Sequence, residues 1–264
     1  MFFGVSKPCS VGRSLSWGIV SVVSVATAWT PALAAAPRVL ATTTVVADLV
    51  RQVAGDRVTV DCLMGPGVDP HSYKATPRDA ERLSRADLVV ANGLRLEGKI
   101  AVMLDRLGKR ARVVQLAESI PPARLIAVAE GVYDPHVWFD ARLWSVCVPA
   151  VVEPLSAIDP AGRDAFATRA AAYVKRLEEL DDHARDRIGS IPEQRRVLVT
   201  SHDAFRYFGR GYGIEVIGLQ GTSTDSEAGL ADIVRLVDLV VGRKLPAVFV
   251  ETSVADRNMT ALRE

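Results

Sequence analysis

The sequence predicts an α/β protein in which parallel sheets are flanked by helices. Two observations lead to this fold class. Short β-branched or apolar runs alternate with helical patterns on both sides of residues 159–190, which is typical of βαβ units and parallel sheets. Between the two series, one apolar stripe continues at helical spacing for about 26 residues, or roughly 39 Å at about 1.5 Å per residue. A chain of 264 residues can form one large domain or two small ones, and a helix of this length can span two lobes.

The first series of elements begins after residue 36. The expected strands are rich in β-branched or apolar residues and comprise residues 38–43, 57–63, 87–91 and 112–115. The expected helices between them comprise residues 45–54, 77–85 and 99–107. Thr76 is a suitable N-cap for the second helix, and Pro77 suits its first position.

The middle of the chain leads into the long helix. Pro121-Pro122 opens an irregular connection, and a helix is expected from near Asp140, with strain or a kink at Pro149. The long helix starts at Asp159-Pro160 and stops at residues 189–192, which contain a glycine and a proline. Its apolar stripe follows steps of three and four residues through Phe166, Ala170, Tyr173, Leu177, Leu180, Ala184 and Ile188.

The alternation of strands and helices resumes after the long helix. The expected strands are residues 196–200, 214–219 and 247–251, and the expected helices are residues 204–212, 230–241 and a segment near Asp256. We expect the last of these strands to be buried, with the Glu251 carboxylate at its end. The chain then stops at Glu264 with no closing element.

Residues 1–36 have the features of a secretory signal peptide. Two basic residues precede an apolar stretch at 17–28, and Ala32-Leu33-Ala34 or Ala34-Ala35-Ala36 offers a cleavage pattern. A membrane anchor is the competing interpretation, but the apolar run is shorter than the roughly 20 residues that a spanning helix needs. We therefore expect export with cleavage. No cysteine follows the apolar stretch as a site for lipid attachment.

The charge balance argues against a polyanionic partner. The formal net charge is +1, and removal of residues 1–36 leaves 30 basic and 31 acidic residues, a net charge of −1. Because the two signs are interspersed, no basic field exists to attract nucleic acid or an anionic membrane surface.

The cysteines point to free thiols. Cys9 would leave with the signal peptide, whereas Cys62 and Cys147 lie in apolar runs and lack C-x-x-C spacing. An exported protein could join them in a disulfide, but we expect both to be buried and free.

Three of the four histidines stand in settings that suit metal ligands. His71 and His136 each end an Asp-Pro-His tripeptide, whose proline stiffens the turn, and His202 follows a strand. Open α/β sheets bind ligands beyond the carboxyl ends of their strands. The spacings of 65 and 66 residues differ from the H-E-x-x-H pattern of metalloproteases. The fourth histidine, His183, lies among acidic residues and is expected at the surface.

We predict that His71, His136 and His202 converge on one divalent transition metal ion. Imidazole is the commonest protein ligand of such ions, three imidazoles suit zinc, and an added carboxylate would extend the choice to manganese or iron. Three structural histidines held by hydrogen bonds are the alternative interpretation.

Longer stretches of the chain, three of which contain these histidines, resemble the metal-binding solute-binding proteins of ABC importers, the TroA-like family for zinc, manganese or iron. The resemblance covers the chain from about residue 38 to its end, and the matching stretches are Met64-Gly65-Pro66-Gly67-Val68-Asp69-Pro70-His71, Asp134-Pro135-His136-Val137-Trp138-Phe139-Asp140, Val197-Leu198-Val199-Thr200-Ser201-His202-Asp203-Ala204-Phe205, Gly218-Leu219-Gln220-Gly221 and Phe249-Val250-Glu251-Thr252-Ser253.

The resemblance implies two α/β lobes joined by the long helix, with the metal in the cleft between them. It divides the chain into a signal peptide (1–36), an N-terminal lobe with His71 and His136 (37–158), a linking helix (159–190) and a C-terminal lobe with His202 (191–264). It implies a periplasmic monomer, not an enzyme, that carries zinc, manganese or iron as transported ligand to an ABC permease in the membrane.

Two departures from the family pattern bear on the site. The family's fourth ligand is usually an aspartate beyond the position of Glu264, so we expect an incomplete C-terminal lobe, weaker folding and weaker metal binding. Glu251 is expected to support the site rather than to bind the ion. Residues 121–132 contain no histidine, unlike the His-rich insertion of many zinc-specific members, which leaves manganese, iron and zinc open.

Two other functions compete with that of a metal carrier. An exported zinc hydrolase could use the same three histidines with an open water position. It would need an acid/base group near the metal-bound water, for which Asp203 and Asp140 are the nearest candidates in sequence, although each could instead orient a histidine. A surface adhesin of the same fold is the third possibility, and the missing lipid site argues against it.

Overall fold

The computed structural model describes residues 35–107, 112–225 and 228–253. The described residues from 36 onwards form one unit by their contacts. The expected signal peptide, apart from its last two residues, and the helix expected near Asp256 therefore lie outside the described residues.

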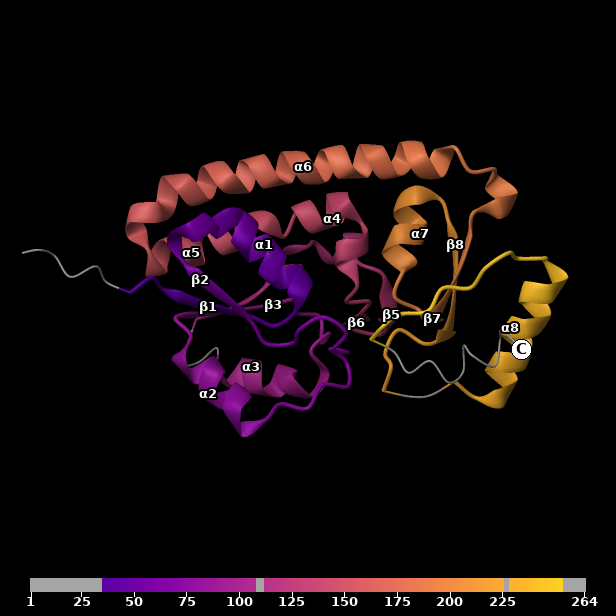
Figure 1. Cartoon of the computed structure of the whole chain (residues 1–264), viewed down its shortest axis with the longest axis horizontal. Helices are drawn as coiled ribbons and strands as arrows, with labels where there is room; N and C mark the ends of the chain where they lie inside the picture. The colour runs from indigo at the N-terminus through magenta and orange to yellow at the C-terminus, as the bar shows by residue number, and fades with distance from the viewer. Residues whose placement is uncertain (1–34, 108–111, 226–227, 254–264) are drawn as a thin grey trace, which may run out of the picture. The chain divides into compact units, whose positions relative to one another are not determined.

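The first sheet has four parallel strands in the order β2-β1-β3-β4 (Figure 1). Their bounds are Thr59–Cys62, Arg38–Ala41, Leu88–Ala91 and Val113–Gln115. Successive side chains of β1 enter different cores, since Val39 and Ala41 pack with α1 (Thr44–Ala54), whereas Leu40 packs with α2 (Pro77–Arg85) and α3 (Ala101–Leu107). Both faces of the sheet are covered, which is why the central strand β3 is continuously apolar and fully buried.

Local sequence accounts well for α2. The Thr76 hydroxyl accepts a hydrogen bond from the backbone N–H of Asp79, and the Asp79 carboxylate accepts one from the backbone N–H of Thr76. This reciprocal capping box, with Pro77 at the first helical position, starts the helix where the sequence predicted.

The connection after Pro121 is more ordered than expected. It contains an antiparallel hairpin of β5 (Ala127–Ala129) and β6 (Val132–Tyr133), which the sequence analysis missed because both strands are short and irregular in register.

The helical segment after Asp140 is interrupted at Pro149, as predicted. It consists of α4 (Ala141–Ser145), a 3₁₀ helix (Val148–Val151) and α5 (Val152–Ile158). By length and composition alone, Ala141–Ile158 could cross a membrane, but in the structure its apolar side chains pack into the first core.

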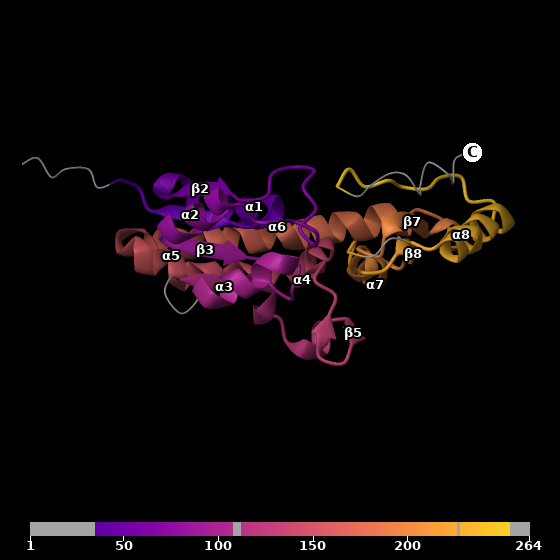
Figure 2. The same cartoon turned by 90° about the horizontal axis from the view of Figure 1, so that it is seen from below.

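The long helix α6 (Arg163–Gly189) contacts α1, α4 and α5 of the first lobe and α7 (Arg206–Tyr212) of the second. Figure 2 shows its length from a second side. Most of the predicted stripe is buried, but the prediction for Leu180 was wrong, because that side chain is 52% exposed. The neighbouring Asp181 is buried instead and pairs with Arg142 of α4 and Arg185 of α6 at 2.7 and 2.8 Å. An ion-pair cluster around Asp181 thus lies between the helices where an apolar contact by Leu180 was expected.

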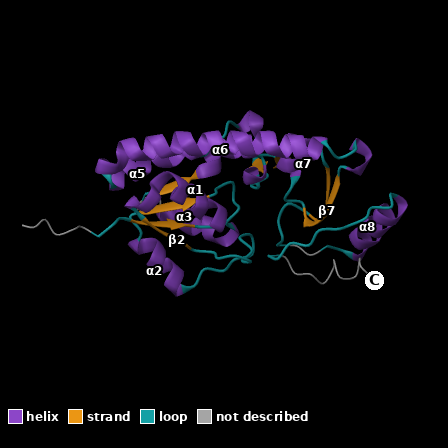
Figure 3. Cartoon of the chain, turned by 45° about the horizontal axis from the view of Figure 1, so that its top comes forward, coloured by secondary structure: helices purple, strands orange, loops and turns teal. Residues whose placement is uncertain are grey.

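The second lobe contains a parallel pair, β7 (Val197–His202) and β8 (Glu215–Gln220), with α7 and α8 (Leu230–Gly242) (Figure 3). The predicted buried strand at 247–251 was wrong. Only Phe249 bridges to Thr200, and Phe249 and Val250 are 53% and 43% exposed. The physical reason is that Phe249 borders an open cavity of about 630 Å³ rather than a packed layer.

The remaining local predictions agree with the structure in part. Cys62 and Cys147 are both free, but only Cys147 is fully buried, and burial raises the pKa of its thiol to about 12. His183 is exposed on α6, as expected.

We predict that Asp181→Asn lowers the free energy of unfolding by about 1–3 kcal/mol, because it removes charge-assisted hydrogen bonds whose arginine partners can still reach water. Leu180→Ala, at the adjacent exposed position, should change it by less than about 0.5 kcal/mol. Urea unfolding of the two variants checks this, and equal losses would contradict the role given to Asp181.

Candidate metal site

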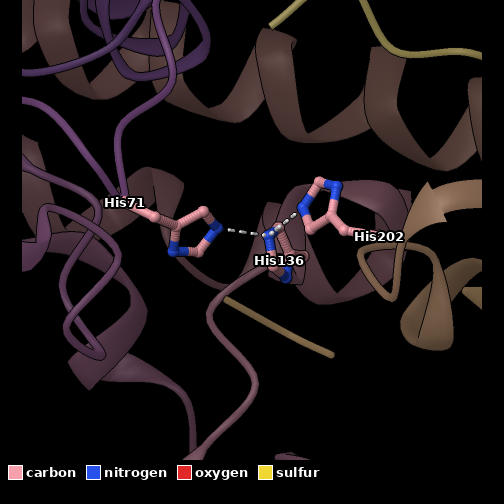
Figure 4. A group of neighbouring side chains, drawn as sticks. All are labelled: His71, His136 and His202. Carbon is pink, nitrogen blue, oxygen red and sulfur yellow. Dashed lines mark hydrogen bonds between the residues drawn. The ribbon is translucent and has the colours of Figure 1, made fainter. Parts of the chain in front are cut away.

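The structure brings His71, His136 and His202 together, although 65 and 66 residues separate them along the chain (Figure 4). The Nε2 atom of His136 lies 3.1 Å from Nε2 of His71 and 3.3 Å from Nε2 of His202. One ring nitrogen from each histidine lies within 4.8 Å of the others, and all three side chains are buried. Their use as metal ligands stays a prediction.

The two Asp-Pro-His tripeptides form the same turn. The Oδ1 atom of Asp69 accepts a hydrogen bond from the backbone N–H of His71 at 3.0 Å, and Oδ1 of Asp134 accepts one from His136 at 3.0 Å. An aspartate that bonds the backbone two residues on makes an Asx turn, which the intervening proline stiffens. Both histidines thus leave the chain from rigid local structure. The third, His202, is the last residue of β7.

Two carboxylates orient the imidazole rings. The Nδ1 atom of His136 lies 2.7 Å from Oδ1 of Asp134, and Nδ1 of His202 lies 2.7 Å from Oε2 of Glu251. Because an ionised carboxylate only accepts hydrogen bonds, Nδ1 of His136 carries the hydrogen and its Nε2 carries a lone pair. Nδ1 of His202 lies close to Glu251 but has no hydrogen-bond partner among the described residues. Such outer partners fix the tautomer and orientation of metal-binding histidines.

Asp134 also connects the site to the second lobe. Its carboxylate is fully buried, and its backbone carbonyl accepts a hydrogen bond at 2.8 Å from the hydroxyl of Tyr207 on α7. The same hydroxyl accepts a hydrogen bond from the backbone N–H of Ile126. Tyr207 therefore holds two segments of the first lobe near His136.

A second contact joins the loop after β8 to the His71 turn. The hydroxyl of Thr224 donates to Oδ2 of Asp69 at 2.5 Å, and Ser72 donates to the same oxygen. Asp69 thereby bonds the His71 turn on one side and the second lobe on the other.

The imidazole of His71 is neutral near pH 7. Burial, together with the nearby His136, lowers its pKa from 6.5 to about 4. A neutral imidazole can offer its lone pair to a cation, whereas a protonated one cannot.

The supporting carboxylates differ partly from those that the sequence suggested. Glu251 lies beside His202, in the supporting position expected for it. Asp140 instead caps α4 by accepting from the backbone N–H of Leu143, and Asp203 pairs with Arg206 at 2.8 Å. Asp134 was not predicted as the partner of His136, although the repeated Asp-Pro-His tripeptide was a signal that could have identified it.

Comparisons with known proteins place this arrangement in context. The sequence profile of a family described as "Zinc-uptake complex component A periplasmic" matches residues 39–264. The chain is 46% identical over 228 residues to the zinc-binding protein TroA of Treponema pallidum, covering 86% of this chain and 74% of TroA. It is also 46% identical over 228 residues to the manganese-binding lipoprotein MntA of Bacillus subtilis, with the same coverage of both chains.

The comparison with solved structures agrees with the sequence comparison. The periplasmic zinc-binding protein TroA from Treponema pallidum superposes with a TM-score of 0.83 over 86% of this chain and 82% of that one, at 46% identity. Fe(III)-bound YtgA from Chlamydia trachomatis superposes with a TM-score of 0.77 over 86% and 84% of the two chains, at 29% identity. The fold with a long linking helix is therefore shared with metal-binding proteins.

We predict that the metal-free protein loses stability as the pH falls from about 6.5 towards 4. In this window the unfolded chain binds a proton at His71 that the folded chain excludes, so the contribution is complete above pH 6.5 and declines below it. Thermal unfolding at several pH values in the presence of a chelator measures the slope. The slope should be shallower in His71→Gln and unchanged in His183→Gln, and equal slopes in all three proteins would contradict this assignment.

Proposed function

Because this chain belongs to the family of the periplasmic zinc-uptake component ZnuA, we propose that it captures a divalent transition metal ion with His71, His136 and His202 and delivers it to an ABC permease. It does so as an exported monomer in the periplasm, after cleavage within residues 1–36. The named relatives bind zinc or manganese, and one solved relative holds Fe(III), so the proposed cargo is zinc, manganese or iron.

One observation carries the proposal. The Nε2 atom of His136 bears a lone pair, since its Nδ1 faces Asp134, and it lies 3.1 and 3.3 Å from Nε2 of His71 and His202 in a buried site. Three neutral imidazoles whose nitrogens converge in this way can bind one cation between them. Ligands about 2.0–2.1 Å from a tetrahedral ion are separated by about 3.3 Å, which agrees with the observed spacing.

The origin of the ligands suggests how uptake and release work. His71 and His136 belong to the first lobe and His202 to the second, so an ion bound by all three joins the lobes. The contact of Thr224 with Asp69 can form only when the lobes are close. Release to the permease then requires separation of His202 from the other two, while α6, packed on both lobes, limits the opening.

The nearby carboxylates favour binding over hydrolysis. Asp134 and Glu251 contact histidine Nδ1 atoms, and Asp203 is paired with Arg206, so these three are already engaged in holding other groups. A hydrolase would need one of them to exchange protons with a metal-bound water. No observation in the described site favours that second function.

We predict that Zn²⁺ or Mn²⁺ raises the unfolding temperature of the intact protein, because a ligand at about 100 times its Kd adds about 2.7 kcal/mol of stability. His136→Ala should abolish the shift, since it removes the central ligand, while His183→Ala should keep it. Differential scanning calorimetry with and without metal measures the effect. An unchanged transition in the wild-type protein would contradict metal capture.

A further inference from the structure

The loop at residues 92–98 has an unusual backbone. It follows β3, and Gly93, Leu94, Arg95 and Gly98 all have positive φ angles, of 86°, 51°, 64° and 47°. Residues with a side chain rarely adopt this conformation, and two in succession persist only where the surroundings hold them. Such strain is concentrated at ligand sites.

A buried carboxylate holds the loop in this conformation. Glu97 is 1% exposed, and its Oε1 accepts hydrogen bonds from the Thr42 hydroxyl at 2.8 Å and from the backbone N–H of Asn92 at 2.7 Å. Its Oε2 accepts from the backbone N–H of Gly93 at 3.3 Å. The end of the loop is thus tied to its own start and to the end of β1.

The start of the loop contacts the His136 turn. Asn92 is fully buried, and its Nδ2 donates to the backbone carbonyl of Pro135 at 3.0 Å. Pro135 stands between Asp134 and His136, so this bond fixes the peptide directly before the central histidine to the end of β3. The Oδ1 atom of Asn92 has no hydrogen-bond partner among the described residues. Among the described residues, this side chain therefore bonds only through its two Nδ2 hydrogens, which reach the backbone carbonyls of Pro135 and Gly93.

The end of the loop contacts the His71 turn. A Cβ atom built on Gly98 would lie 2.2 Å from the backbone carbonyl oxygen of His71. Real Cβ atoms do not approach oxygen this closely, so only glycine lets the two backbones touch here. The loop and both histidine turns also border one cavity of about 350 Å³, lined by His71, Arg95, Gly98 and Pro135 among others.

We propose that Asn92 and Glu97 are positioning residues for metal binding: the loop at 92–98, closed by Glu97, sets the separation of His71 and His136 by holding Pro135 through Asn92 and His71 through Gly98. This inference rests on the proposed function, since positioning matters only if these histidines bind metal. On this proposal, the relative positions of His71 and His136 are held by residues that contact neither the ion nor an imidazole ring.

The first test removes the bond to Pro135 without adding volume. In Asn92→Ala, the Zn²⁺ affinity should fall about 10–100-fold, the usual effect of losing an outer-shell partner. The d–d absorption of bound Co²⁺ should also change, because it reports the geometry of the ligands. A residue with only a structural role would lower the unfolding temperature of the metal-free protein but leave the affinity and the spectrum of the folded molecules unchanged.

The second test displaces the His71 turn, and it keeps the proposal testable if Asn92→Ala fails to fold. Gly98→Ala places a methyl group against the His71 carbonyl and should weaken Zn²⁺ binding by a similar factor. Gly131→Ala is the matched control, because Gly131 also has a positive φ, of 67°, but no atom lies within 4 Å of its added Cβ. This control carries the backbone strain without the contact and should keep the wild-type affinity and Co²⁺ spectrum.

The outcomes separate this inference from the proposed function. A wild-type protein that does not bind Zn²⁺ or Co²⁺ would refute metal capture itself. If the wild type binds and the Asn92 or Gly98 variant binds with the same affinity and spectrum, the positioning role is overturned and metal capture stands. If Gly131→Ala weakens binding as much as Gly98→Ala, strain alone explains the loss and the proposed contact is likewise overturned.

Discussion

The buried contact between Asp134 and His136 is the interaction on which the rest of the site depends. The Oδ1 atom of the buried Asp134 carboxylate receives both the backbone N–H and the ring Nδ1–H of His136, whereas its Oδ2 atom has no hydrogen-bond partner among the described residues. These two bonds leave the Nε2 lone pair of His136 directed at the other histidines. Since Tyr207 bonds the carbonyl of the same aspartate, the second lobe is positioned against His136.

A second polar cluster relates the linking helix to both lobes. Asp181 lies buried on α6, where Arg142 reaches it from α4 of the first lobe. Arg185, its other partner, also donates to the backbone carbonyl of Gly211 near the end of α7. The charges meet at the place where α6 passes from one lobe to the other.

Sequence reasoning succeeded where the deciding contacts lie within a few residues. The capping of α2 by Thr76 and Asp79 is complete within four positions, and the interruption at Pro149 follows from one missing N–H. It failed where distant partners decide. Leu180 fits the helical period of α6, but the arginines that bury Asp181 instead are not visible in that period. Residues 247–251 have the composition of a buried strand, yet their burial depends on a layer that the described residues do not place over Phe249.

The groups available to the site follow from the amino-acid sequence alone: three scarce histidines, two of them in an Asp-Pro-His turn whose hydrogen bond spans two residues. The meeting of their Nε2 atoms depends on tertiary packing, because 65 and 66 residues separate the histidines and no local rule sets that distance. Tertiary packing also decides which carboxylate faces which imidazole, pairing Asp134 with His136 inside one motif and Glu251 with His202 across 49 residues. The physical reason is that hydrogen bonds within a turn are encoded by neighbouring residues, whereas the approach of two strands or loops is set by how the cores beneath them pack.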